Sequence, residues 1–437
     1  MDILFASPDS HRNTDGPRVW TRRLALALAE RGKKVGVAVI RRTARAGYLE
    51  EQLEGSPVTV FSRDSGSHSE NARWIESLVR ENRPAVLVAQ HHFPALTACY
   101  RLRSFPVETV MVMHSDDTLY WRLSDFYLKP GQECPKHLVC VSRYLFDRQT
   151  AARVNDDAYE IHQVPYGVEV PPELPAREPN PLRLLYVGRM TQRQKRIRDV
   201  VRAFCAACEA VPGTTATLVG AGREEAEVRE LAETLPGGSA LRFTGLLTAE
   251  ETREEFGKHD AIVLLSDYEG LPISLMEAMA WGLVPVVTKM TSGIPELVQD
   301  GETGLVVDNR GEAFTAAVRA LSSDHGLRTR LSEAAARKIR EGYGLDQAVG
   351  FWEGLIHSAR TETGREEVAE IRETGFPRGL WRQPWGDASV APWYQKPIAS
   401  LLDALWAFWI RIPVERRVRI KRLFGRRDPE IHAPASP

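Results

Sequence analysis

Short, strongly apolar runs recur along residues 1–170, and amphipathic segments separate several of them. The runs are rich in branched side chains and have no polar face, which is typical of strands buried on both sides of a parallel sheet. Residues 19–31 show the period of an amphipathic helix. The expected strands are residues 3–6, 34–40, 85–90, 108–114 and 137–142.

The pattern changes at residues 165–181, which are rich in proline and charge and have little periodicity. Such a composition predicts a linker. Beyond it the alternation of strand and helix restarts. The expected strands of this second half are residues 183–189, 215–222, 241–245, 261–266 and 284–288.

This repetition predicts an α/β fold with two doubly wound Rossmann-like domains that face a cleft. Ligands of such open sheets bind outside the carboxyl ends of the strands. We expect a first domain at residues 1–170 and a second at residues 171–345. A closing helix at residues 346–360, expected to pack back toward the first domain, and a Trp/Arg-rich tail at residues 361–437 complete the chain.

The tail holds five of the ten tryptophans and a dense basic run. Residues 398–410 are apolar but too few to span a bilayer. Residues 411–427 carry eight basic side chains against one acidic residue, Glu415. An apolar segment beside a basic run favours an anionic membrane surface, bound through residues 398–427. The alternative is a tail that packs on its own first domain and keeps its arginines solvated.

Charge and cysteine content narrow the function classes. The formal net charge is −1, so no global field attracts nucleic acid, and we expect no nucleic-acid partner. Five cysteines are an odd and sparse set, which is not a disulfide framework. Cys205 and Cys208 form a C-A-A-C pair inside a helical pattern, without a second pair to complete a zinc site, and we expect buried structural thiols.

The N-terminal residues read as a strand and not as a signal peptide, because no basic segment precedes an apolar run. No stretch reaches the ~18 apolar residues needed for a membrane-spanning helix. These features predict a cytoplasmic protein, with a peripheral position on the inner face of the plasma membrane if the tail binds lipid.

The most informative segment is SDYEGLPISLMEAMAWGLVPVV, which begins where an expected strand ends at Ser266. Pro272 lies near a predicted helix start, where its missing N–H costs nothing. The helix is expected to run to about Trp281 and to stop at Gly282. Its N-terminus would face the ligand edge, where free N–H groups and the helix dipole favour an anion such as a diphosphate.

Two carboxylates bracket this turn, Glu269 before the helix and Glu277 inside it. Eight residues at a helical rise span about 12 Å, whereas the carboxylates of a hydrolytic pair lie about 5–9.5 Å apart. The two therefore suit an elongated ligand touched at both ends, such as a sugar and a ribose on either side of a diphosphate. The alternative is a dipole partner, Glu269, and a surface helix residue, Glu277.

The segment EGLPISLMEAMAWGLVPVV resembles the E-x7-E signature of family-4 retaining glycosyltransferases of the GT-B fold. The resemblance covers roughly residues 1–359. It extends to YVGRMTQRQKRIRDVVRAF, where Arg189 and Lys195 stand at the positions that hold the donor diphosphate in the family. Arg196 stands where many relatives have glycine, and the loop is one residue longer, so either Lys195 or Arg196 reaches the phosphate. The alternative is a solvated basic loop.

Other elements follow the family pattern in order. TATLVGAG matches a strand and glycine turn, in which Gly220 and Gly222 permit a tight turn. SGIPELVQDGETGLVV matches the closing turn, in which Gly293, Gly304 and Glu296 are expected to be structural.

In the first domain the family has a glycine loop, and Gly16 would let the backbone approach the donor. Here Pro17 replaces the second glycine of many relatives. The resemblance places His114 near the donor sugar, and a structural histidine at a strand end is the alternative. Asp116 and Asp117 are candidates for acceptor contact.

The resemblance implies a hexosyltransferase that retains the anomeric configuration and takes a nucleotide-diphosphate sugar as co-substrate. We expect no metal or other cofactor, because two cationic side chains already face the phosphates. It implies donor binding in the second domain and a glycan, lipid-linked or small-molecule acceptor in the first. A nucleotide-sugar epimerase or hydrolase on the same fold, or a non-catalytic nucleotide-sugar binding protein, are the alternatives. The expected catalytic residues are Glu269, His114, Arg189 and Lys195. The expected donor-binding residues are Gly16, Arg189, Lys195, Glu269, Gly270, Leu271, Pro272 and Glu277.

Overall fold

A computed structural model describes residues 1–9, 15–41, 45–90, 92–116, 118–128, 135–153, 159–178 and 180–361. The chain forms two compact units. The first contains Met1–Val141, Phe146–Val164 and the described residues from Val349 on, and the second contains Ser142–Leu145 and Pro165–Ala348. The predicted membrane-binding tail, including residues 398–427, lies outside the described residues.

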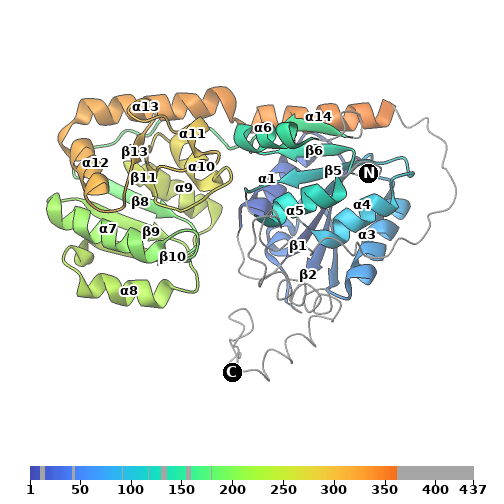
Figure 1. The fold of residues 1–437 in the computed structure, drawn as a ribbon, viewed down its shortest axis with the longest axis horizontal. Coiled ribbons are helices and arrows are strands. Elements are labelled where there is room, and N and C mark those ends of the chain that lie inside the picture. Colours follow the sequence, from blue (N-terminus) through green and yellow to red (C-terminus); the bar gives the residue numbers. More distant parts are fainter. Residues whose placement is uncertain are drawn as a thin grey trace, which may run out of the picture. The chain divides into compact units, whose positions relative to one another are not determined.

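The first unit is built on a seven-stranded sheet with the order β3-β2-β1-β4-β5-β6-β7, in which every pair is parallel (Figure 1). The predicted apolar runs form the central strands, and β4 and β6 are buried at every position. The strands are β1 (Ile3–Asp9), β2 (Val35–Arg41), β3 (Thr59–Asp64), β4 (Val86–Ala89), β5 (Glu108–Met113), β6 (His137–Cys140) and β7 (Glu160–Gln163).

Helices connect these strands. The first helix begins after Asp15, whose carboxylate accepts a hydrogen bond from the Arg18 N–H, and it buries Trp20, Leu24 and Leu28 at helical spacing. The helices of this part of the chain are α1 (Gly16–Glu30), α2 (Tyr48–Leu53), α3 (His68–Asn82), α4 (Phe93–Arg101), α5 (Thr118–Tyr127) and α6 (Arg143–Ala152).

The last described helix, α14 (Leu345–Thr361), belongs to the first unit from Val349 on. Trp352 is fully buried, and its ring packs against those of Phe5 and Trp20 at centroid distances of 6.3 and 5.7 Å. Glu353 on the same helix pairs with Arg31 at 2.9 Å. Helix α14 therefore completes the core beside β1 and α1, although it lies far from them in the sequence.

The second unit repeats the architecture with a six-stranded sheet in the order β10-β9-β8-β11-β12-β13, and all of its pairs are parallel. This confirms the predicted fold class of two doubly wound α/β units. The strands are β8 (Arg183–Val187), β9 (Thr215–Val219), β10 (Leu241–Gly245), β11 (Ala261–Leu264), β12 (Val284–Thr288) and β13 (Leu305–Val307).

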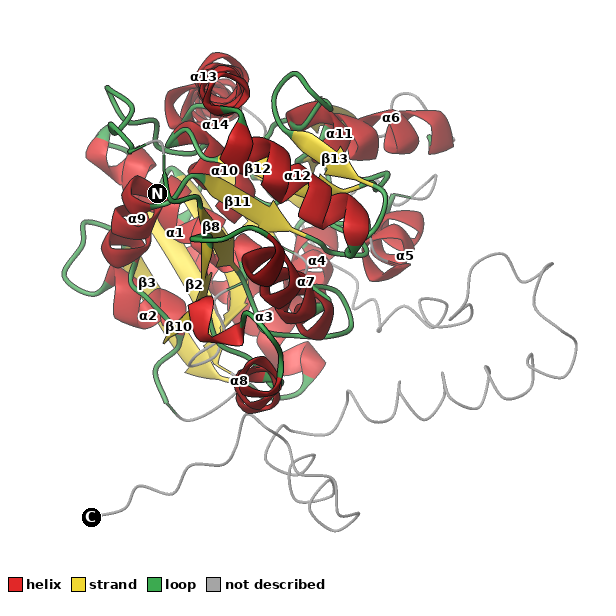
Figure 2. Cartoon of the chain, turned by 90° about the vertical axis from the view of Figure 1, so that its left-hand side faces the viewer, coloured by secondary structure: helices red, strands yellow, loops and turns green. Residues whose placement is uncertain are grey.

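Helices cover the strands of this sheet, and Figure 2 shows α10 beside β11 and β12, with which it is in contact. The helices are α7 (Ile197–Ala210), α8 (Glu225–Thr234), a 3₁₀ turn (Gly238–Ala240), α9 (Ala249–Lys258), α10 (Ile273–Ala280), α11 (Ile294–Leu297), α12 (Glu312–Ser323) and α13 (His325–Gly342).

The core of the second unit includes the buried face of α7, on which Cys205 and Cys208 lie. Both are free thiols, which confirms the expectation of buried structural cysteines. Burial raises the pKa of the Cys208 thiol to about 12, so the thiolate that a metal would need is disfavoured at neutral pH.

The chain enters and leaves the second unit through two segments that are bonded to each other. Val168 donates its N–H to the Tyr343 carbonyl at 3.0 Å and accepts from the Leu345 N–H at 3.0 Å. A Cβ on Gly167 would lie 2.7 Å from the Leu345 Cα, so only glycine permits this approach. In the described part of the chain, no helix combines the length and the apolar character needed to cross a membrane.

Candidate active site

Both sheets reverse their strand order beside their first strand. In the second unit the chain moves from β8 outward to β10, then returns to place β11 on the other side of β8. The loops that follow β8 and β11 leave the sheet at the same edge and diverge from there. This switch point is where open α/β sheets bind their ligands, and both predicted donor-binding segments lie on these two loops.

Lys195 and Glu269 meet at this edge. The Lys195 Nζ donates to the Glu269 Oε1 at 2.6 Å, and the two side chains are only 10% and 6% exposed. Lys195 follows β8 and Glu269 follows β11, so the pair connects the two loops of the switch point. The predicted cation and carboxylate are therefore brought together in the second unit.

Gln194 reinforces this connection. Its Nε2 donates to the Tyr268 carbonyl at 3.1 Å and to the Glu269 Oε2 at 3.4 Å. Its backbone carbonyl accepts from the Asp267 N–H at 3.0 Å. Sequence reasoning missed this residue, although an amide directly before the predicted phosphate lysine was a usable signal.

Arg189 joins the same network and remains exposed. Its Nη2 donates to the Gln194 Oε1 at 3.0 Å. The buried Tyr186 hydroxyl donates to the Arg189 carbonyl at 2.8 Å, which fixes the backbone of the turn after β8. The guanidinium is thus positioned at the site but retains donors that face solvent.

Arg196 points elsewhere. Its Nε lies 2.9 Å from the Asp199 Oδ2 and 3.5 Å from the Asp267 Oδ2. Of the two basic residues considered for the phosphate, Lys195 is the one that reaches Glu269. Arg196 also has φ 55° and ψ 40°, which is the left-handed conformation that glycine adopts without strain. The backbone at this position would therefore suit a glycine.

Helix α10 starts directly after the Glu269 loop. Pro272 is its N-cap, and the helix ends at Ala280 with Trp281 as C-cap and Gly282 at φ 77°. The first turn leaves N–H groups without helical acceptors, which is the arrangement that favours an anion. The Ser274 hydroxyl donates to the Val187 carbonyl at 3.1 Å and ties the helix to the end of β8.

The remaining predicted donor-binding residues lie along this loop and helix. Gly270 and Leu271 are buried, and the Gly270 carbonyl accepts from the Gly293 N–H at 2.9 Å. Glu277 is half buried on the second turn of α10. Glu269 lies in the loop before the helix, whereas Glu277 lies within the helix.

Two glycines shape the neighbouring turns. A Cβ on Gly220 would lie 2.0 Å from the Gly188 carbonyl oxygen, and one on Gly222 would lie 2.2 Å from that of Met190. Gly220 also has φ 133°. The G-x-G element therefore lets the turn after β9 pack on the turn after β8, which carries Arg189.

The first unit has its own switch point between β1 and β4, and a hydrogen-bonded chain crosses it. The Thr21 hydroxyl donates to the Pro17 carbonyl at 2.8 Å, so it accepts from the Gln90 amide. The Gln90 Oε1 then accepts from the His114 Nε2 at 2.7 Å. This order of donors places the His114 proton on Nε2.

His114 is buried between aromatic rings. Its centroid lies 5.2 Å from that of Trp20 and 6.2 Å from that of Tyr120. Sequence reasoning identified His114 but missed Gln90 and Thr21, because neither stands in a recognisable motif. The histidine is therefore held in one orientation by residues from α1 and from the end of β4.

Three further residues of the first part of the chain were predicted to contact the donor or the acceptor: Gly16, Asp116 and Asp117. Gly16 is the first residue of α1, directly after the N-cap Asp15. The Asp116 Oδ1 accepts from the Trp121 indole at 2.7 Å and from Arg148 at 2.8 Å, so this carboxylate already has two donors within its own unit. Asp117 lies outside the described residues.

Glu296 was expected to be structural. Its carboxylate accepts from the Arg143 N–H at 2.9 and 3.2 Å, in the first turn of α6, where backbone N–H groups have no acceptor within the helix. This contact supports the structural role.

Two protein-family models match the chain. The model described as Glycosyl transferases group 1 matches residues 173–338, and the model described as Glycosyltransferase Family 4 matches residues 14–171. Each model therefore falls on one half of the described chain.

Characterised relatives match more locally. Glycogen synthase of Mycobacterium tuberculosis is 33% identical over 171 residues, which is 38% of this chain and 41% of the relative. The lipopolysaccharide core biosynthesis glycosyltransferase LpsE of Rhizobium meliloti is 35% identical over 124 residues, 28% of this chain and 36% of the relative. The match thus spans about two fifths of the length of these relatives.

Solved structures match over most of the chain. HepE of Anabaena in complex with UDP-glucose superposes with a TM-score of 0.66 at 15% identity, over 82% of this chain and 99% of that one. At this identity the likeness concerns the fold, which both proteins share.

Proposed function

Because the chain belongs to the family-4 glycosyltransferases of the GT-B fold, we propose that it transfers a sugar from a nucleotide-diphosphate donor to an acceptor hydroxyl. The anomeric carbon would keep its configuration. In the transfer, the bond from the anomeric carbon to the diphosphate oxygen breaks and a bond to the acceptor oxygen forms. The proton of the acceptor hydroxyl leaves with the nucleoside diphosphate.

The observation that carries this proposal is the buried Lys195–Glu269 pair at the β8/β11 switch point. The departing diphosphate gains negative charge as the glycosidic bond breaks, and a fixed ammonium in a partly dry site stabilises that charge. Arg189 adds a second cation with free donors, and the first turn of α10 adds backbone N–H groups.

Glu269 would have two partners during the reaction. In the structure it pairs with Lys195. When the diphosphate takes a share of the ammonium, the carboxylate becomes available to accept hydrogen bonds from sugar hydroxyls. Glu277, on the second turn of α10, would accept from the ribose hydroxyls at the other end of the donor.

In the first unit we assign His114 to the sugar that is being transferred and Gly16 to backbone approach at the start of α1. The Thr21–Gln90–His114 chain supports this assignment, because it fixes the ring and places a proton on Nε2. Asp116 is engaged by Trp121 and Arg148, which favours a positioning role in acceptor binding over direct contact. Asp117 stays a proposed acceptor contact.

No divalent metal and no other cofactor is proposed for the transfer, since Lys195 and Arg189 supply the positive charge at the diphosphate. The acceptor class we propose is a glycan or lipid-linked sugar. The relatives named for glycogen and for lipopolysaccharide core synthesis support a saccharide acceptor. A lipid-linked acceptor would suit an anionic membrane surface bound by residues 398–427, on the cytoplasmic face.

One experiment tests the proposal against the epimerase, the hydrolase and the non-catalytic binder. The full chain is incubated with labelled nucleotide sugars, with and without a set of glycan acceptors, and the products are followed by NMR. We expect acceptor-dependent transfer with the anomeric configuration of the donor. Release of free sugar without acceptor dependence, epimerised donor, or binding without turnover on all acceptors would each reject it.

A further inference from the structure

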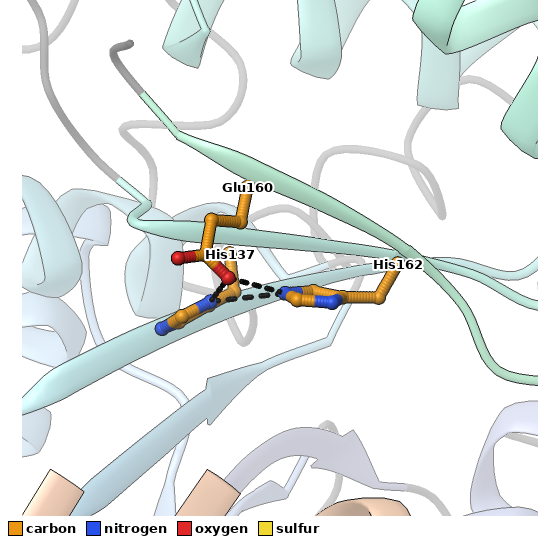
Figure 3. A group of neighbouring side chains, drawn as sticks. All are labelled: His137, Glu160 and His162. Atoms are coloured by element: carbon orange, nitrogen blue, oxygen red, sulfur yellow. Dashed lines mark hydrogen bonds and ion pairs between the residues drawn. The ribbon is translucent and has the colours of Figure 1, made fainter. Parts of the chain in front are cut away.

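Three side chains at the edge of the first sheet converge on one point, away from the residues discussed so far. They are His137, the first residue of β6, and Glu160 and His162 of the edge strand β7 (Figure 3). The register pairs His137 with Glu160, and successive residues of a strand alternate between faces. Glu160 and His162 therefore lie on the same face of the sheet as His137.

The distances between their ligand atoms fit a tetrahedral ion. His137 Nδ1 lies 3.1 Å from His162 Nε2 and 3.7 Å from Glu160 Oε2, and the latter two atoms are 3.4 Å apart. Ligands about 2.0–2.2 Å from a tetrahedral zinc are separated from one another by about 3.3–3.6 Å. A small movement of flexible side chains would equalise the three distances.

A fourth residue orients the first ligand. Glu108 of β5 lies 3.2 Å from the His137 Nε2 and also accepts from Lys136 at 2.8 Å. A carboxylate at Nε2 keeps the proton there and leaves the Nδ1 lone pair directed at the other two ligands. A carboxylate behind a histidine is the usual support for a metal-bound imidazole.

The surroundings suit an ion that enters from solvent. The His137 and His162 side chains are 11% and 22% exposed, whereas Glu160 is 72% exposed and opens one side of the cluster. The Phe351 ring packs on His162 with centroids 5.1 Å apart and covers another side. Two imidazoles and one carboxylate with an open fourth position form a ligand set typical of Zn²⁺, and are a poor set for Mg²⁺ or Ca²⁺.

We propose that His137, Glu160 and His162 bind one Zn²⁺ that fastens the edge strand β7 to β6. The strand has only four residues and is the last element before the chain enters the long segment of the second unit at Pro165. An ion bound to both strands stabilises the folded state by mass action, since the unfolded chain does not assemble the ligands. The cluster contains none of the residues that we assign to sugar transfer.

The test uses the full chain, stripped with a chelator, and Zn²⁺ as the probe. Zinc content is measured after dialysis, affinity by competition with a chromophoric chelator, and coordination by the visible spectrum of the Co²⁺ form. The variants are Glu160→Gln, which changes an exposed side chain and preserves folding, and His162→Gln. His357→Gln is the matched control, because it removes an exposed histidine from α14 outside the cluster.

We expect one equivalent of Zn²⁺, a tetrahedral Co²⁺ spectrum and a melting temperature that rises with Zn²⁺. Both cluster variants should weaken binding at least tenfold, and the control should bind like the wild type. The proposal is overturned if the wild type binds no zinc at one equivalent, which would leave a proton shared between the two imidazoles. It is also overturned if both cluster variants bind as the wild type does.

Discussion

Lys195 of the loop after β8 and Glu269 of the loop after β11 form a buried ion pair with an Nζ–Oε1 distance of 2.6 Å. The pair connects the two neighbouring strands at which the sheet order reverses. Removing one partner alone leaves a buried charge without compensation, which costs about 3–5 kcal/mol in comparable pairs. Single substitutions at this site therefore combine a loss of ligand contact with a loss of stability.

Alanine substitutions of Arg189 and Arg196 form a matched pair of variants that tests donor binding. Arg189 is exposed and retains free donors, whereas Arg196 pairs with Asp199 and Asp267. We expect Arg189→Ala to weaken nucleoside diphosphate binding about tenfold or more, the value of a hydrogen bond to a charged group. Arg196→Ala should change it less than about twofold. Calorimetric titration measures both, and equal losses would contradict the assignment of Lys195 and Arg189 as the clamp.

The backbone of residue 196 gives a stability prediction. Arg196 has φ 55°, a conformation that costs a residue with a side chain about 1–2 kcal/mol relative to glycine. Arg196→Gly and Arg196→Ala lose the same ion pairs, so their difference isolates the backbone. We expect the glycine variant to be more stable than the alanine variant by about 1 kcal/mol in denaturant unfolding. An alanine variant of equal or higher stability would show that this strain is absent.

His114 should matter for transfer and not for nucleotide affinity. The residue belongs to the first unit, whereas the proposed diphosphate ligands belong to the second. We expect His114→Gln to lower kcat about 10²-fold, the scale of losing one positioned donor in a reaction site. The dissociation constant of the nucleoside diphosphate should stay unchanged. His357→Gln controls for the loss of a histidine, and a kcat for His114→Gln close to that of the wild type would reject the assigned role.

His68 predicts how stability depends on pH. Burial and, to a smaller extent, the nearby Arg101 guanidinium lower its pKa to about 4. His68 is the first residue of α3, and its Nε2 lies 3.0 Å from the Thr97 hydroxyl oxygen. An unfolded histidine titrates near pH 6.5, so between about pH 6.5 and 4 the unfolded chain binds a proton that the folded chain does not.

The contribution of neutral His68 to the free energy of unfolding is therefore complete above about pH 6.5. It falls as the pH drops, by at most about 1.4 kcal/mol per pH unit. It levels off below about pH 4. Urea unfolding of wild type and His68→Asn at several pH values isolates this contribution by subtraction. We expect the difference in unfolding free energy between the two proteins to shrink from pH 7 to pH 5. A constant difference would contradict the lowered pKa.

The central strands could be predicted from the sequence because they are buried on both faces and appear as uninterrupted apolar runs. Of the four edge strands, β10 was predicted at residues 241–245, whereas β3, β7 and β13 were not. Their side chains are partly exposed, and β7 carries the polar sequence EIHQ. β3 and β7 bury little on one side and show neither an apolar run nor a clean alternation, and β13 has only three residues, too few for a pattern to show.

Likewise, only some residues of the candidate site could be predicted from the sequence. Residues that stand in a motif, such as Glu269 and Lys195, were predicted, and the fold brings them into contact. Residues that act by supporting them, such as Gln194 and Gln90, were not predicted, because the strand order and not local sequence creates their contacts. The same holds for the cluster of His137, Glu160 and His162, which only the pairing of β6 with β7 assembles.

The most direct measurement of the central claim is calorimetric binding of nucleoside diphosphates to wild type and to the double variant Lys195→Met/Glu269→Gln. The double variant removes both charges together and leaves neither partner buried alone, so its unfolding temperature should stay near that of the wild type. We predict that the wild type binds at least one of UDP, GDP and ADP, and that the double variant binds the same nucleotide at least about 100-fold more weakly. Equal affinities in two folded proteins would contradict the claim that the buried pair marks the diphosphate site.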